Sequence, residues 1–424
     1  MSHLPYHLTT RLALKLPLPR GKLADSLRGR SRATERWLQW ASTQRTNAPL
    51  LWVHGASVGE GLTAQPVVAR VKSAIPGLQT VHTFSSPSAE SWPQGFGTDR
   101  SDYVPPDEAR HVARVLTALN PSLLVFSRGD LWPELVTQAQ AANVPVAVIG
   151  GTVKPSSRRL SWPVRSLLGT MHRGLCWVGA ASEADADRWV RLGVPSEAVT
   201  VTGDPRHDQI VERVSRLGAI QPLVAWARNR EVLVAGSVDL VDGRVLLEAF
   251  TKVSRSHHPA GLILVPHDPS PRNLAGQVKL AAEYGIRLAV WDGGEINVET
   301  PCVLAATLGV LADVYLVAQL AYVGGGFHPG RLHAAAEPAA FAIPVIIGPK
   351  HRSSMDAQLL LQGRGAVSLP ARTSSETCAT IWGNWLSRPE IRIQTGLDAR
   401  RALRQGAALA TASALVRIAW PHTT

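Results

Sequence analysis

The stretch YVGGGFHPGRLHAAAEP, from Tyr322 to Pro338, decides the fold of this chain. An apolar run ends in Gly324, Gly325 and Gly326, a polar loop follows, and a short helical stretch then carries Glu337. Glycines at a strand end let the backbone approach a ligand closely, and the free N–H groups of a following helix favour phosphate. Glu337 is placed to accept hydrogen bonds from sugar hydroxyls. The stretch therefore predicts a site for a nucleotide attached to a sugar.

Short apolar runs recur along the chain, with helical stretches between them, and they form two series. The first series is Leu50–Val53, Thr80–Phe84, Leu123–Phe126, Val144–Ile149, Leu175–Gly179 and Val199–Thr202. The second series is Glu231–Ala235, Gly261–Val265, Arg287–Trp291, Cys302–Ala305, Leu320–Val323 and Val345–Ile347. Most runs lack polar alternation, which indicates strands buried on both faces of a parallel sheet. The pattern predicts an α/β chain with two doubly wound, Rossmann-like domains.

Predicted boundaries divide the chain into a basic segment at residues 1–47, an amino-terminal domain at 48–210, a carboxyl-terminal domain at 211–395 and a C-terminal part at 396–424. The last part is predicted to form one helix from about Ala399 to Trp420 and to pack back on the amino-terminal domain. Ligands of open parallel sheets lie beyond the carboxyl ends of the strands. We therefore expect the active site in a central cleft between the two domains.

Composition excludes several classes of protein. The chain has 424 residues, of which 45% are hydrophobic and 18% are charged, as in a soluble globular protein. Cys176, Cys302 and Cys378 lie far apart without a CxxC motif, which argues against a zinc cluster or a disulfide framework and fits a reducing compartment. No cleavable signal is visible, and no segment approaches the roughly 18 apolar residues of a spanning helix.

Basic residues concentrate at the start of the chain, whose net charge is +12. Residues 1–50 hold only two acids against nine basic residues, namely Arg11, Lys15, Arg20, Lys22, Arg28, Arg30, Arg32, Arg36 and Arg45. Leucines, Trp37 and Trp40 lie between these charges, a pattern that suits an anionic membrane surface. A solvated helical face fits the pattern equally well. Nucleic-acid binding is the third alternative, although no known nucleic-acid module is recognisable.

Acidic and basic side chains follow two strands of the first series. The run ending at Val53 continues into HGASVGE, residues 54–60, so that Glu60 lies at a strand-to-helix turn. Glu60 there is either a general base or a first-turn acid that favours the helix dipole. The run ending at Phe126 continues into Arg128 and Asp130, with Pro133 where a helix would begin. Asp130 is either a helix cap or a site residue, and Arg128 could hold an acidic substrate.

Polar strand ends of the second series are candidates for contact with a phosphate or a base. They include Gly236 with Ser237, and His267 with Asp268. Arg206, at the domain join, either reaches a phosphate or carboxylate or is simply solvated. Neither an Asp-x-Asp motif in a strand-end loop nor a GxGxxG motif after the first strand of either domain is present, which disfavours a metal-dependent sugar transferase and a dehydrogenase.

These motifs resemble one family, the transferases that move 3-deoxy-D-manno-octulosonic acid (Kdo) from CMP-Kdo onto lipid A precursors. The resemblance runs from about residue 48 to residue 367. It rests on the segments Trp52–Glu60, Asp130–Leu135, Ala181–Ala186, Val201–Asp204, Gly324–His333, Glu337–Ala339 and Gly348–Pro349. The sequence departs from the family pattern at Asp130, Arg206 and Ala334, where the family has glutamate, often lysine, and asparagine.

The resemblance implies a GT-B fold and an inverting, metal-independent transfer, with no cofactor beyond the donor CMP-Kdo and with Glu60 as the catalytic base. It implies that the amino-terminal domain contacts the acceptor sugar through Ser57, Gly59, Arg128, Asp130 and Trp132. It implies that the nucleotide contacts Arg206, Gly236, Ser237, His267, Gly325, Gly326, His333 and Glu337. The protein would act in lipopolysaccharide biosynthesis, bound peripherally to the cytoplasmic face of the inner membrane. The alternatives are a GT-B transferase with another nucleotide sugar, and a relative that binds nucleotide or lipid with little turnover.

Overall fold

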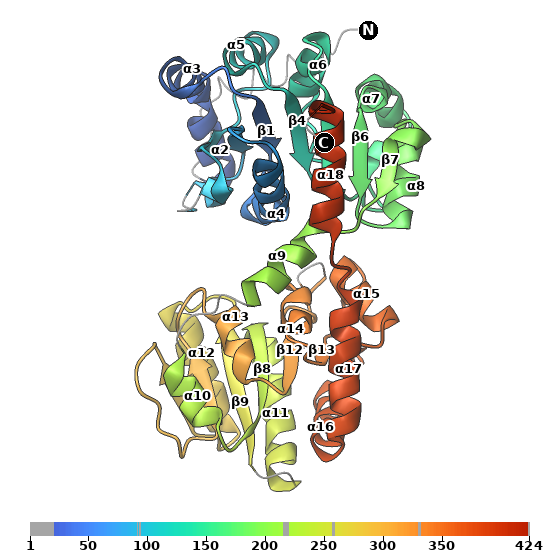
Figure 1. The fold of residues 1–424 in the computed structure, drawn as a ribbon. Coiled ribbons are helices and arrows are strands. Elements are labelled where there is room, and N and C mark those ends of the chain that lie inside the picture. The colour runs from blue at the N-terminus through green and yellow to red at the C-terminus, as the bar shows by residue number, and fades with distance from the viewer. Residues whose placement is uncertain are drawn as a thin grey trace. The chain divides into compact units, whose positions relative to one another are not determined.

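A parallel seven-stranded sheet forms the centre of each of the two units into which the chain divides (Figure 1). The first unit contains the described residues up to Gln209 and those from Arg404 onward, and the second unit runs from Ile210 to Leu403. The computed structural model describes residues 21–90, 92, 95–214, 220–256, 259–329 and 332–422. Gly330 and Arg331 of the quoted stretch, and residues 1–20 of the basic segment, lie outside these ranges.

The strand order in the first unit is β3-β2-β1-β4-β5-β6-β7. The strands are β1 (Leu50–His54), β2 (Gln79–Phe84), β3 (Arg100–Tyr103), β4 (Leu123–Ser127), β5 (Val146–Gly151), β6 (Trp177–Ala180) and β7 (Val199–Val201). The helices are α2 (Lys22–Ser31), α3 (Ala33–Gln44), α4 (Val58–Ala74), α5 (Ala109–Leu119), α6 (Pro133–Ala141), α7 (Val164–Arg173), α8 (Glu183–Leu192), α9 (Pro205–Val214, which continues into the second unit) and α18 (Ala407–Ala419). Short 3-10 turns are η1 (Pro87–Ala89), η2 (Gly95–Gly97), η3 (Arg158–Leu160) and η4 (Ser196–Ala198).

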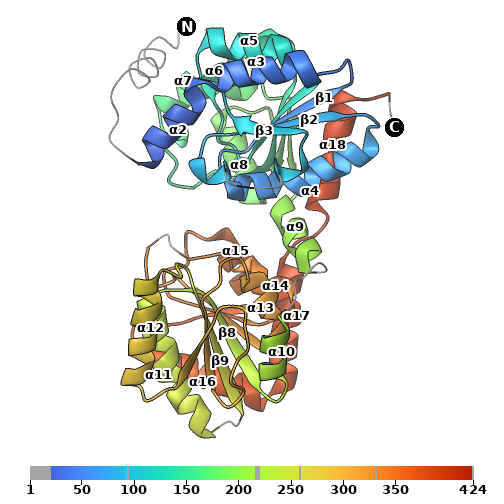
Figure 2. The same cartoon turned by 90° about the vertical axis from the view of Figure 1, so that its left-hand side faces the viewer.

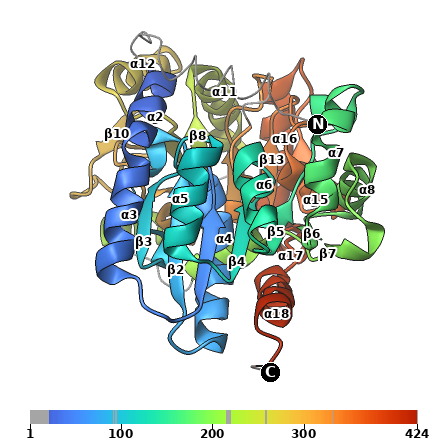
Figure 3. The ribbon, with the colours of Figure 1, turned by 90° about the horizontal axis from the view of Figure 1, so that it is seen from above.

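Both faces of this sheet are buried, because successive side chains of each strand enter different cores. Leu51 and Val53 of β1 pack in the core that contains α4 and α18. Leu50 and Trp52 pack in the core that contains α3, α5 and α6, which Figure 3 shows side by side over the strands. This burial explains why the central strands read as continuous apolar runs in the sequence.

The C-terminal helix α18 completes the first unit. Leu415 packs in the same core as Val67 and Val71 of α4, and Figure 2 shows the two helices close together. The Asp208 carboxylate accepts hydrogen bonds from the backbone N–H groups of Gly406 (2.6 Å) and Ala408 (2.8 Å), which caps the start of α18.

The prediction of one helix from Ala399 to Trp420 is therefore wrong. The segment contains two helices, since α17 ends at Ala402 and α18 begins at Ala407. Gly406 lies between them with a φ of +91°, a backbone conformation that ends a regular helix and that glycine adopts readily.

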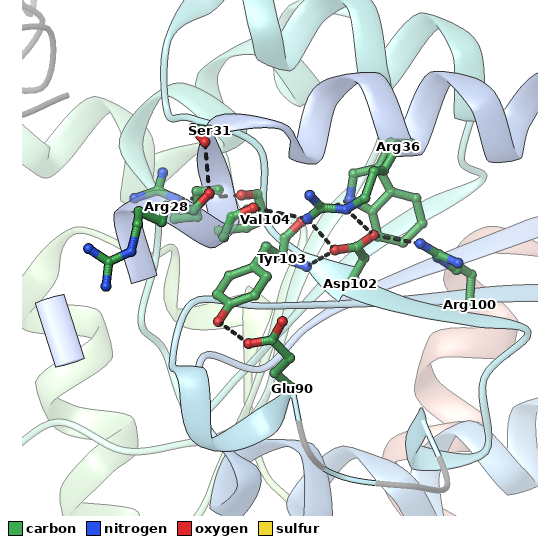
Figure 4. A network of polar contacts seen from close by, with 11 residues as sticks. Arg28, Ser31, Arg36, Glu90, Arg100, Asp102, Tyr103 and Val104 are labelled. Carbon is green, nitrogen blue, oxygen red and sulfur yellow. Dashed lines mark hydrogen bonds and ion pairs between the residues drawn. The ribbon is translucent and has the colours of Figure 1, made fainter. Parts of the chain in front are cut away.

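Several basic residues near the start of the chain face the protein rather than solvent. Arg30 is buried, donates to the carbonyls of Val104 (3.4 Å) and Pro105 (3.1 Å), and lies over the ring of Trp132. Arg36 forms an ion pair with Asp102 (2.6 Å), which also pairs with Arg100 (Figure 4).

Arg45, at the end of α3, likewise donates to the carbonyls of Leu119 (2.8 Å) and Ala48 (2.6 Å). The basic segment is thus not a uniform solvated or membrane-facing surface. Between residues 21 and 47, where the structure describes the segment, three guanidinium groups hold α2 and α3 on the sheet.

The second unit repeats the same plan, with strand order β10-β11-β9-β8-β12-β13-β14 and parallel neighbours. The strands are β8 (Glu231–Val238), β9 (Ala260–Pro266), β10 (Leu288–Trp291), β11 (Cys302–Ala305), β12 (Leu320–Val323), β13 (Val345–Ile347) and β14 (Ala366–Ser368). The helices are α10 (Gln221–Ala227), α11 (Leu240–Ser256), α12 (Pro271–Glu283), α13 (Leu311–Val314), α14 (Ala336–Ala340), α15 (Met355–Gln362), α16 (Ser374–Ser387) and α17 (Pro389–Ala402), with the 3-10 turn η5 (Tyr315–Val317).

Residues of β8 alternate between two cores in the same way. Leu233 and Ala235 pack with α11 and α16, and Val232 and Val234 pack with Trp226 of α10. Figure 2 shows α11 and α12 on one side of β8 and β9, and α10 on the other. The α/β class and the two Rossmann-like domains predicted from the sequence are thus confirmed. The central cleft stays a prediction.

Candidate functional site

Each sheet has one topological switch point, and most of the predicted site residues lie on or after the two strands that flank it. In the first unit the chain runs from β1 outward to β2 and β3, then returns to place β4 on the other side of β1. The connections after β1 and β4 therefore diverge at the carboxyl ends of these strands, which is where doubly wound folds bind ligands. Glu60 follows β1, and Arg128 and Asp130 follow β4. The Ser127 hydroxyl donates to the Glu60 carbonyl (2.8 Å) and joins the two connections.

Glu60 is the third residue of α4, and its carboxylate accepts a hydrogen bond from the Ala56 N–H (2.5 Å). Burial raises the pKa of Glu60 to about 7, and the negative charge of Asp130 adds to this effect, whereas the N–H groups of Ala56 and Ser57 and the charge of Arg128 oppose it. A carboxyl group with such a pKa exchanges protons readily at neutral pH. The position also fits the alternative interpretation, since Glu60 is a first-turn acid with a local backbone contact.

Space lies open beside this turn. Ser57 precedes α4 as its N-cap residue without a capping hydrogen bond from its side chain. A Cβ atom added to Gly59 would meet no atom of the described residues within 4 Å. The helix start next to Glu60 thus has open space at Gly59.

Arg128 is held by other residues of the first unit. Its backbone has a φ of +64°, and its guanidinium group donates to the carboxylate of buried Asp204 (2.6 Å) and to the Thr63 hydroxyl (3.3 Å). One edge of the guanidinium is thus occupied by protein. The predicted contact of Arg128 with an acidic substrate stays a prediction, and any such contact would use the remaining N–H groups.

Asp130 does not cap the following helix, so that this alternative is wrong. The carboxylate of Asp107 caps α6 instead, because it accepts hydrogen bonds from the N–H groups of Glu134 (3.2 Å) and Leu135 (2.9 Å). Desolvation raises the pKa of Asp130, and the charge of Arg159 opposes this rise. Asp130 is therefore free of a helix-capping role and acts on the pKa of Glu60.

Sequence reasoning missed Arg159, which follows β5 and donates to the Gly129 carbonyl (2.8 Å). Burial lowers the pKa of Arg159, while Asp130 opposes that change. Trp132, a predicted sugar contact, packs with its ring 4.2 Å from the guanidinium carbon of Arg30. A basic residue in the segment after β5 could have been sought in the sequence, but its electrostatic interaction with Asp130 could not have been predicted.

In the second unit, a cavity of about 300 Å³ lies at the switch point between β8 and β12. Its lining includes four of the predicted nucleotide contacts, namely Gly236, Ser237, His333 and Glu337. A fifth, His267, lies beside them, because its ring centre is 4.3 Å from that of His333. The structure thus brings together residues that are about 100 positions apart in the sequence.

Tyr315 is a lining residue that the sequence did not reveal. A Cβ atom on Gly236 would lie 2.4 Å from the Tyr315 hydroxyl oxygen, so that only glycine leaves room for this side chain. Burial raises the pKa of Tyr315 well above its ordinary value, and the charge of Glu337 adds to the rise. Tyr315 therefore stays protonated and forms one wall of the cavity.

The three glycines after β12 pack mainly against protein. A Cβ on Gly324 would lie 2.3 Å from the Ser237 carbonyl oxygen, and a Cβ on Gly326 would lie 2.6 Å from Gly348. The Gly325 N–H donates to the carboxylate of Asp242 (2.9 Å). The Gly325 N–H is therefore already bonded within the protein, and the nucleotide contact predicted for Gly325 stays a prediction. The contact predicted for Gly326 stays untested.

Arg206 belongs to the first unit, at the second position of α9, whereas the other predicted nucleotide contacts lie in the second unit. Its backbone N–H donates to the Asp204 carboxylate (3.0 Å). Its role toward a phosphate stays a prediction.

Two Rossmann-like units of this kind, each with a switch point at the centre of its sheet, make up the GT-B fold. The chain has the fold of a glycosyltransferase from Rickettsia africae, with a TM-score of 0.59 and 11% identity over 89% of this chain and all of that one. Residues 31–209 match the family model of 3-deoxy-D-manno-octulosonic-acid transferase (kdotransferase).

Two curated proteins named 3-deoxy-D-manno-octulosonic acid transferase match most of the chain. The protein from Haemophilus influenzae is 26% identical over 77% of this chain and 76% of its own length. The protein from Bordetella pertussis is 29% identical over 84% of this chain and 85% of its own length. Over most of its length the chain is thus similar to Kdo transferases, as the motifs predicted.

Proposed function

We propose that this protein transfers Kdo from CMP-Kdo to a lipid A precursor in lipopolysaccharide biosynthesis. The observation that carries the proposal is the carboxyl group of Glu60, which lies at the switch point of the first sheet with a pKa of about 7. The family supports the donor sugar, since both matched relatives are named for Kdo.

In this reaction the Glu60 carboxylate accepts the proton of an acceptor hydroxyl, and the hydroxyl oxygen forms a bond to the anomeric carbon of Kdo. The bond from that carbon to the phosphate oxygen breaks, and CMP departs with the electron pair. Direct attack from the opposite side inverts the anomeric carbon. Burial raises the pKa of Glu60 to about 7, and the charge of Asp130 adds to that rise and so supports Glu60 as the base. The proposed step needs no metal ion.

The cavity of the second unit would hold the nucleotide. Glu337 offers a carboxylate to the ribose hydroxyls, and Ser237 and His333 offer polar groups to the phosphate or base. Arg206 would stabilise the negative charge that develops on the departing phosphate.

We propose that the protein works peripherally at the cytoplasmic face of the inner membrane. No helix among the described residues is both apolar and long enough to cross a bilayer. The surplus of basic residues gives the chain a charge of +12, which favours an acidic lipid acceptor and an anionic surface.

The test is transfer of Kdo from CMP-Kdo to a lipid A precursor by the purified protein, with CMP release as the readout. Product formation supports the proposal. A thermal shift with UDP but not with CMP would instead indicate a different nucleotide sugar. Nucleotide or lipid binding without turnover of any donor would indicate a binding protein.

A further inference from the structure

Two acids at the start of α11 form a capping box. The Asp239 carboxylate accepts hydrogen bonds from the N–H groups of Val241 (2.8 Å) and Asp242 (3.0 Å). In return, the Asp242 carboxylate accepts from the Asp239 N–H (3.1 Å). This reciprocal pattern satisfies the free N–H groups of a helix start, and a surface helix would require nothing more from these residues.

Both acids also hold the loop that follows β12, more than 80 positions away in the sequence. Asp242, which is fully buried, accepts a hydrogen bond from the Gly325 N–H (2.9 Å) and another from the Tyr322 hydroxyl (2.6 Å). Asp239, at the surface, pairs with the ring of His328 (2.9 Å). The loop is thus fastened to α11 at two points, one buried and one half-exposed.

The fastened loop leads directly into the nucleotide cavity. The His333 N–H donates to the Gly324 carbonyl (3.2 Å), so the position of the glycines determines where His333 lies. Gly324 also packs on the Ser237 carbonyl, and Ser237 and His333 both line the cavity. A side chain that fixes Gly325 therefore fixes cavity residues that it does not touch.

We propose that Asp239 and Asp242 are positioning residues that hold Gly324–Pro329 and His333 in the positions that bind the donor nucleotide. The inference rests on the proposed function only for the identity of that nucleotide. The latch, defined as Asp239, Asp242, Gly325 and His328, acts on binding through the loop. Its loss therefore raises the dissociation constant of the nucleotide more than it changes the rate at saturation.

Two pairs of variants test the latch by calorimetric titration of the full chain with CMP and, separately, with UDP. Asp242→Ala removes the acceptor of the Gly325 amide, and we expect about a tenfold weaker affinity. Asp242→Asn should bind the nucleotide with an affinity within about threefold of the wild type, because an amide oxygen can accept the same N–H groups. His328→Ala weakens binding by about threefold, and His328→Gln, which keeps a donor to Asp239, recovers it.

Two controls separate positioning from stability. Tyr322→Phe removes one hydrogen bond to Asp242 but leaves both backbone amides bound, so we expect lower stability and unchanged affinity. Arg401→Ala removes an exposed ion pair with Asp398 on α17 and should alter neither.

Hydrogen exchange of residues 320–335 provides a readout that needs no nucleotide. We expect faster exchange of the Gly325 segment in Asp242→Ala and in His328→Ala than in their conservative partners. The latch is overturned if both alanine variants bind the nucleotide with the affinity of the wild type. If no nucleotide binds, the latch is overturned when both alanine variants show the hydrogen-exchange rates of the wild type. Binding of UDP in place of CMP by the wild type overturns the donor of the proposed function and leaves the comparison of variants valid.

Discussion

Replacement of Glu60 by glutamine should abolish transfer and, at the same time, stabilise the protein at alkaline pH. The amide oxygen of glutamine can still accept the hydrogen bond from the Ala56 N–H, so the turn is retained. The amide cannot take a proton from the acceptor, and loss of a general base lowers rates by about 10²–10⁴-fold. With a pKa of about 7 for Glu60, kcat/KM of the wild type should rise about tenfold between pH 6 and pH 8.

The stability change follows from the direction of the same shift. The folded pKa of about 7 lies above the ordinary value of 4.5, so that the folded state binds more protons than the unfolded state between these pH values. Stability is therefore lost as the pH rises through this window. Between pH 5.5 and pH 8 a fully desolvated carboxyl would lose about 2 kcal/mol, and we expect about 1–2 kcal/mol for half-buried Glu60. Glu60→Gln should be free of this loss.

The assay combines Kdo transfer at several pH values with urea unfolding at pH 5.5 and pH 8. The expected result is an inactive variant whose unfolding free energy exceeds that of the wild type by more at pH 8 than at pH 5.5. Glu35→Gln, an exposed first-turn acid of α3, is the matched control and should change neither quantity. If Glu60→Gln retains a tenth or more of the wild-type rate, or if its stability advantage does not grow with pH, the assignment of the base is refuted.

Three further predictions concern the surroundings of the two sites. Asp130→Asn should lower the pKa of Glu60 and move the acid limb of the pH–rate profile to lower pH, and an unmoved limb would remove Asp130 from this role. Gly236→Ala, whose Cβ would lie 2.4 Å from the Tyr315 hydroxyl, should destabilise the protein by about 1–3 kcal/mol in urea unfolding and weaken nucleotide binding in titrations. Asp208→Ala should cost about 1–2 kcal/mol, measured in the same way, because α18 loses its cap; equal stability of variant and wild type would contradict that account.

All central strands of both sheets were predicted from the sequence, as were the edge strands β7 and β10. Central strands such as β1 and β12 are buried on both faces, so that their apolar runs were readable. The two missed strands, β3 and β14, lie at sheet edges. Edge strands need no continuous apolar run, and β3 has the polar sequence Arg-Ser-Asp-Tyr.

The candidate site was predictable in part for a similar reason. Gly236 lies near the carboxyl end of β8, and His333 and Glu337 follow β12. Parallel strands bring their carboxyl ends to one edge, so local sequence sufficed to place these residues together. The partners of Gly325 and Arg128 were not predictable, because Asp242 and Asp204 are 83 and 76 positions away. Hydrogen bonds over such separations depend on the packing of whole elements, which no local pattern encodes.

The return of α18 to the first unit has a consequence for synthesis of the protein. Asp208 and α4 contact a segment that begins at Gly406, and Gly406 lies 198 positions after Asp208 in the chain. At about 5–20 residues per second, a ribosome needs about 10–40 s to make the intervening segment. During this interval Val67 and Val71 of α4 lack the apolar helix that covers them in the folded chain. The first unit is thus the first to be synthesised but the last to be complete. During the interval a chaperone could bind the apolar face of α4 that α18 later covers.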